Sequence, residues 1–132
     1  KSNLIPGNNP RTREINILKR ELAAEQLVAH SNDVRKSFPE GIHGFVLGGD
    51  FNTNRDEFVS ERTLSIFEKA GFIDPFAKLP LPLRITRPRS GRYPDTTFDY
   101  ILSKGLRQIG NPEILKTNVS DHYPVTSELI LP

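Results

Sequence analysis

The chain has 132 residues, and its 18 Lys and Arg residues against 16 Asp and Glu residues give a formal net charge of +2. This length fits one domain, and the near balance of charge excludes a histone-like polycation. The absence of cysteine excludes disulfides and thiolate metal sites, and no apolar run approaches the roughly 20 residues of a membrane span. Because the chain begins at Lys1 rather than Met, we expect the natural protein to extend upstream, and the sequence indicates no compartment.

Two helices are expected in the first half of the chain. Over residues 14–37, Ile15, Leu18 and Leu22 recur at helical spacing and form an apolar stripe typical of an amphipathic helix. Residues 60–69 have a similar pattern and are followed by a glycine, which favours a helix end.

Four short segments have the composition of β-strands. Residues 45–47 are wholly apolar, as expected of a strand buried on both faces. Residues 98–102, 113–119 and 125–131 also have strand-like composition. The proline-rich stretch over residues 74–94 is long for a structureless connection, so we expect it to be functional or partly ordered.

A polar cluster follows the first predicted strand. Gly48 and Gly49 allow the backbone to turn, and Asp50 and Asn52 come directly after them. On an extended segment these two side chains point to the same side, where the carboxylate accepts a proton from a water and the amide donates to a phosphoryl oxygen. The alternative is a simple turn, because Asp and Asn both favour turns.

A third acid, Asp99, lies inside the predicted strand 98–102. Acids are depleted in strand interiors, and a buried one needs a partner. Its functional interpretation is that it holds a histidine ring in one tautomer, and the alternative is an exposed acid on an edge strand. The neighbouring Tyr100 is expected to pack in the core with its hydroxyl hydrogen-bonded.

An acid and a histidine, Asp121 and His122, stand side by side just before the last predicted strand. Asp121 is a candidate metal ligand and His122 a candidate phosphate binder, although a loop pair without a role remains the alternative. Three acids, one Asn and one His at strand ends favour metal-assisted hydrolysis of a phosphoester.

Basic residues crowd the proline-rich stretch. The four arginines are Arg84, Arg87, Arg89 and Arg92. Guanidinium groups suit the geometry of phosphate, so these residues are candidate contacts to a substrate phosphate. A solvated basic loop is the alternative.

Three segments taken in order carry a resemblance to a known family. They are Gly48-Gly49-Asp50-Phe51-Asn52, Phe98-Asp99-Tyr100-Ile101-Leu102 and Ser120-Asp121-His122-Tyr123-Pro124-Val125. This series resembles the endonuclease/exonuclease/phosphatase superfamily, which has the deoxyribonuclease-I-like fold. The resemblance implies an α+β fold that is half of a four-layer α/β/β/α sandwich, with a mixed, mainly antiparallel sheet and helices on one face. Residues 1–132 would then be the C-terminal part of a single domain.

The resemblance also implies a role for each site residue. Asp50 would orient or deprotonate the attacking water, and Asn52 would bind the phosphate. Asp121 would belong to the metal shell, and His122 would contact the phosphoryl oxygen while Asp99 orients its ring. The implied cofactor is Mg²⁺ or Mn²⁺, and oxygen ligands suit magnesium.

The expected function is divalent-metal-dependent phosphoester hydrolysis by an activated water, most simply as a nuclease acting on nucleic acid. The alternatives are a lipid or inositol phosphoesterase, with phospholipid or inositol phosphate as the partner, and a catalytically silent binding module. The family's N-terminal half, which supplies a metal-binding Glu and an Asn, would be a further partner. We therefore expect these 132 residues alone to bind metal weakly, to hydrolyse little, and to have a sheet face that self-associates or is covered by the long loop.

Overall fold

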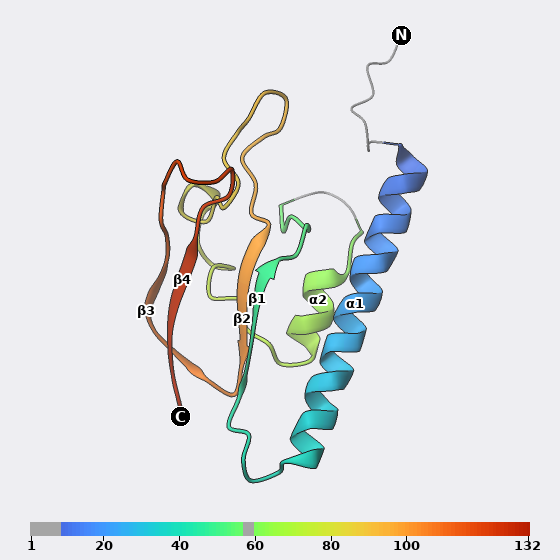
Figure 1. Ribbon diagram of the computed structural model, residues 1–132, viewed down its shortest axis with the longest axis vertical. Helices are drawn as coiled ribbons and strands as arrows, with labels where there is room; N and C mark the ends of the chain where they lie inside the picture. Colours follow the sequence, from blue (N-terminus) through green and yellow to red (C-terminus); the bar gives the residue numbers. More distant parts are fainter. Residues whose placement is uncertain (1–8, 57–59) are drawn as a thin grey trace.

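The computed structural model describes residues 9–56 and 60–132. In chain order its elements are α1 (Pro10–Ser37), β1 (Phe45–Asp50), α2 (Thr63–Lys69), the 3₁₀ turn η1 (Leu81–Leu83), β2 (Asp99–Lys104), β3 (Arg107–Ile114) and β4 (Val125–Ile130). Helices α1 and α2 lie together on one side of the antiparallel pair β1–β2, and the antiparallel pair β3–β4 lies on the other side (Figure 1). The α+β class is confirmed, whereas the assignment as half of a four-layer sandwich stays a prediction.

Helix α1 begins at Pro10 rather than at residue 14. The Asn9 side chain accepts a hydrogen bond of 2.9 Å from the backbone N–H of Arg11. Pro10 occupies the first turn, where the proline lacks only a donor that would have no helical partner. The helix therefore starts four residues before its predicted boundary. No helix in the described ranges is long and apolar enough to cross a membrane.

The apolar stripe of α1 lies on its exposed side. Ile15, Leu18 and Leu22 are 44%, 58% and 54% exposed, respectively. The buried positions of the helix include Ala24, which joins the core, and Glu21. Within the described residues, the stripe is therefore not part of the hydrophobic core.

Strand β1 pairs with β2 in antiparallel register over its whole length. Phe45 and Leu47 pack against the core, whereas Val46 between them is 50% exposed. The prediction that this strand is buried on both faces is therefore wrong. It alternates, as expected where helices cover one face of an antiparallel pair.

Aromatic rings form the centre of the core between the helices and β1–β2. Phe51 contacts Phe67 and Tyr100 edge to face, with both pairs of ring centroids 5.6 Å apart. The buried Tyr100 hydroxyl lies 2.9 Å from the carbonyl oxygens of Thr53 and Thr97, which confirms its predicted packing. Burial raises the pKa of this phenol far above its ordinary value. The core thus anchors the segments that carry Asp50 and Asp99.

The third predicted strand was misplaced. It was expected over residues 113–119, but β3 runs over Arg107–Ile114. Gly110 and Pro112 disfavour a strand in the sequence. The structure accommodates them with a register irregularity between Ile109 and Glu113, since a bulge tolerates a proline that cannot donate to the ladder.

The proline-rich stretch is partly ordered, which confirms one of the two predicted alternatives. It contains η1 and a short hairpin in which Arg87 bridges Thr96 and Ser90 bridges Tyr93. The predicted helix over residues 60–69 appears as α2, which begins at Thr63.

Candidate active site

The end of β1 and the start of β2 bring two acids together. In the β1–β2 register Asp50 is the direct partner of Asp99, and the backbone N–H of Phe51 extends the ladder by donating to the carbonyl of Phe98 at 2.8 Å. Gly49, whose φ of 152° L-residues rarely adopt, precedes the first acid. Residues far apart in the sequence thus place two carboxylates at one end of the strand pair.

Asn52 adopts a left-handed conformation with φ 49°, which is uncommon outside glycine but tolerated by asparagine. Its backbone N–H donates to Asp50 Oδ1 at 2.8 Å. The extended geometry assumed for these two residues is therefore wrong, and the turn is present. The turn fixes one oxygen of the Asp50 carboxylate and leaves the other, Oδ2, for a water or a metal.

His122 pairs with Asp99, as the resemblance implied. Its Nδ1 lies 2.8 Å from Asp99 Oδ2, and the two side chains are 26% and 17% exposed. The ring also stacks on Phe98, with the ring centroids 6.5 Å apart and an interplanar angle of 28°. A carboxylate at Nδ1 favours the tautomer protonated there, so Nε2 is the nitrogen available to a ligand.

A threonine that the sequence did not single out joins the two loops of the site. Thr86 is 1% exposed, and its Oγ1 accepts from the backbone N–H groups of Phe98 and Asp99 at 2.9 and 3.1 Å. Its carbonyl accepts from the N–H of Tyr123, next to His122, at 2.6 Å. Thr86 therefore fixes the position of the Asp99 segment relative to the His122 segment, and nothing in its local sequence marked it.

Three of the predicted residues form a group that could hold a cation. One ligand atom from each of Asp50, Asp99 and His122 lies within 4.8 Å of the other two. Asp121, the predicted metal ligand, lies outside this group. It is exposed, and its Oδ1 contacts the Ser120 hydroxyl at 3.5 Å.

Arg84 departs from its predicted role. It is 7% exposed, donates to the carbonyl of Leu79 at 2.8 Å, and forms a two-pronged ion pair with Asp56. The Arg84 guanidinium lowers the pKa of the Asp56 carboxyl below its ordinary value. Arg84 is thus committed to an internal pair, whereas Arg89 and Arg92 are exposed.

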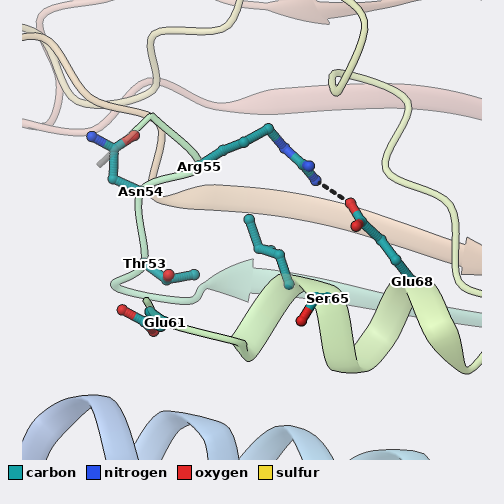
Figure 2. Close-up of a pocket in the computed structure, with 7 residues that line it drawn as sticks. Thr53, Asn54, Arg55, Glu61, Ser65 and Glu68 are labelled. Atoms are coloured by element: carbon teal, nitrogen blue, oxygen red, sulfur yellow. Dashed lines mark ion pairs between the residues drawn. The ribbon is translucent and has the colours of Figure 1, made fainter. Parts of the chain in front are cut away.

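A second group of charges lies beside the site, around a cavity of about 180 Å³. Arg55 donates to Glu68 on α2 at 2.7 Å and to Asp74 at 2.9 Å, and Figure 2 shows it reaching across the cavity to Glu68. Burial lowers the pKa of Arg55, but the two carboxylates outweigh burial and raise it. These pairs hold the segment after Asn52 against α2. Sequence patterns gave no signal for them, because the partners come from three separate segments.

No family model, curated protein or solved structure matches this chain. Support for a function comes from the geometry of Asp50, Asp99 and His122 and from the resemblance of three motifs.

Proposed function

We propose that this chain contributes the reacting groups of a divalent-metal-dependent phosphoesterase, most simply a nuclease that cuts phosphodiester bonds with an activated water. The observation that supports the proposal is the grouping of Asp50, Asp99 and His122 within 4.8 Å of one another. Three separate segments supply them. One carboxylate has a free oxygen, and it lies beside an imidazole that a second carboxylate orients. Such a set of groups can activate a water for hydrolysis.

The residues fit a hard cation. Two carboxylates at one edge suit Mg²⁺ or Mn²⁺, both of which prefer oxygen ligands, and the exposed Asp121 next to His122 offers a third. Asp50 would hold the metal in this proposal, and Asp121, which lies outside the group of Asp50, Asp99 and His122, would be the further carboxylate ligand that the resemblance implies. When bound, a divalent cation neutralises charge that develops on the phosphoryl oxygens.

Each protein group has its own role in the proposed reaction. Asp50 accepts the proton of the water whose oxygen forms the new bond to phosphorus, and the ester P–O bond breaks on the opposite side, its oxygen taking a proton from solvent. In this proposal His122 acts in its doubly protonated form. Its Nδ1–H donates to Asp99, its Nε2–H donates to a phosphoryl oxygen as that oxygen gains charge, and the Asn52 amide donates to another. Stabilising this charge is often the largest catalytic contribution.

The test is a substrate screen with the full-length natural protein. Single-stranded and duplex DNA, RNA, phosphoinositides and phospholipids are incubated with Mg²⁺, with Mn²⁺ and with EDTA. Cleavage of nucleic acid that requires the metal supports the proposal. Release of headgroup or phosphate from lipids alone would favour the lipid or inositol phosphoesterase, and binding without any turnover would favour a silent binding module.

A further inference from the structure

The proline-rich stretch ends in a hairpin that extends from the candidate active site. We call residues 86–97 the hairpin arm. Arg87 and Thr96 exchange two backbone hydrogen bonds of 3.0 Å, and Ser90 and Tyr93 close the tip with bonds of 3.0 and 3.1 Å. In Figure 1 the arm projects beyond the start of β2. Its tip lies four residues from Thr86, or about 13 Å at roughly 3.3 Å per residue.

The root of the arm is fixed to the site. Buried Thr86 accepts from the backbone of Asp99 through its hydroxyl and from the backbone of Tyr123 through its carbonyl. Both acceptors serve segments that carry the Asp99–His122 pair. The arm therefore has a defined orientation relative to the atoms that would act on a phosphate.

The arm has arginines without acidic partners. Arg89 and Arg92 are exposed, and across residues 9–56 and 60–132 neither forms an ion pair. Asp95 is the acid of the arm, and its Oδ1 accepts from the backbone N–H of Arg89 at 2.8 Å. This contrasts with Arg84 at the base of the arm, whose charge is balanced internally by Asp56.

An aromatic ring accompanies these charges. The Arg87 guanidinium lies over the Tyr93 ring, 4.6 Å from its centroid, and Tyr93 is nevertheless 45% exposed. A ring backed by a cation on one face presents its other side to a planar partner. Guanidinium groups together with an exposed ring are the combination with which proteins bind single strands, because phosphates pair with the cations and unpaired bases stack on the ring. A phospholipid headgroup has no planar base to use this ring.

Building on the proposed function, we propose that the hairpin arm binds a single-stranded part of a nucleic-acid substrate next to the bond that is cut. Arg89 and Arg92 bind phosphates of this strand, and Tyr93 stacks on one of its bases. The arm thereby selects the substrate class, while the Asp50, Asp99 and His122 group performs the hydrolysis.

The test measures binding without cleavage. Fluorescence anisotropy follows the full-length protein with a labelled oligothymidylate in EDTA over a range of salt concentrations. The double variant Arg89→Gln/Arg92→Gln should bind at least about tenfold more weakly. Its slope of log affinity against log salt should be less steep by about 1.4, from two lost contacts at roughly 0.7 each. Tyr93→Leu should weaken binding about tenfold with the slope unchanged.

The matched control is Lys19→Gln/Lys69→Gln, which removes two exposed positive charges from the helices and should leave both affinity and slope near those of the wild type. Wild-type binding by the arm variants would overturn the proposal. Tighter binding to duplex DNA or to phosphatidylserine vesicles than to the oligothymidylate would also overturn it. Failure of the proposed function is separately visible, because absence of metal-dependent cleavage leaves this EDTA measurement unaffected.

Discussion

Two clusters of charged side chains lie beside the β1–β2 pair, and they differ in how their charges are balanced. In the ion-pair cluster, which consists of Arg55, Asp56, Glu68, Asp74 and Arg84, each carboxylate contacts a guanidinium. In the candidate active-site cluster, which consists of Asp50, Asp99 and His122, two carboxylates approach each other, and no Lys or Arg of the described residues pairs with either. Asp50 is exposed, whereas Asp99 is partly buried, and a partly buried carboxylate without a Lys or Arg partner is costly unless another group binds it, as His122 does here. We therefore infer a structural role for the first cluster and, if the proposed function holds, a catalytic role for the second.

The largest expected effect is a loss of turnover without a comparable loss of stability. In the full-length protein, Asp50→Asn and His122→Ala should each lower turnover of a phosphodiester by at least about a hundredfold, because each group acts as charge develops in the transition state. Asp50→Asn retains an oxygen for the turn to Asn52. The free energy of unfolding should change by less than about 1 kcal/mol, since both side chains are at least partly exposed. Steady-state assays and urea unfolding measure the two quantities.

Surface residues of α1 provide the controls for this experiment. Asp33→Asn and His30→Ala change exposed side chains of the same types and should leave turnover near that of the wild type. Wild-type turnover in Asp50→Asn or His122→Ala would remove the catalytic assignment.

Substitutions in the ion-pair cluster should lower the free energy of unfolding more than they lower turnover. Arg84→Met removes the partner of Asp56 and should lower the free energy of unfolding by about 2 kcal/mol, less than for a fully buried pair because Asp56 is 35% exposed. Turnover per folded molecule should fall far less than in the Asp50 variant. Urea unfolding of Arg84→Met, Asp56→Asn and the double variant measures the coupling, and additive effects would show that the pair is not coupled.

Substitution of Thr86 should lower both the free energy of unfolding and the turnover, each by a smaller amount. Thr86→Val removes the hydroxyl that accepts from the Asp99 backbone and should lower the free energy of unfolding by about 1–2 kcal/mol together with a several-fold loss of turnover. Thr86→Ser retains the hydroxyl and should recover most of the turnover. Equal turnover in the valine and serine variants would contradict a positioning role.

The smallest expected effect is a pH dependence of stability. Because Arg84 lowers the pKa of Asp56 in the folded state, the pair stabilises the fold above the ordinary carboxyl pKa near 4. This stabilisation is lost as the pH falls through the lower folded pKa. Urea midpoints at pH 7, 4 and 3 should fall less steeply in Asp56→Asn than in the wild type. Parallel declines in the two proteins would assign the acid sensitivity to other groups.

Local sequence was enough to propose candidate site residues but not to predict which of them lie together in the structure. Asp50, Asp99 and His122 stand out because acids and a histidine at strand ends are unusual. Their convergence depends on the register that pairs Asp50 with Asp99, and no local pattern specifies a pairing between distant segments. The left-handed turn at Asn52 was foreseen only as an alternative, since asparagine and aspartate favour turns with or without a function.

The arginines show where sequence reasoning stops. Arg84 and Arg89 have the same chemistry and similar surroundings in the sequence, yet one is buried against Asp56 and the other is exposed. The difference comes from an acid 28 residues away. Similarly, β3 was misplaced because its glycine and proline disfavour a strand locally, whereas pairing with β4 compensates for them.

The central claim is that Asp50, Asp99 and His122 act on one phosphoryl group. A crystal structure of the full-length protein with Mn²⁺ and a phosphorothioate dinucleotide tests it most directly, because manganese is located by its anomalous signal. The account predicts a manganese peak in contact with Asp50 and a phosphoryl oxygen within hydrogen-bond distance of His122 Nε2. Manganese and phosphorus bound with full occupancy away from these side chains would contradict it.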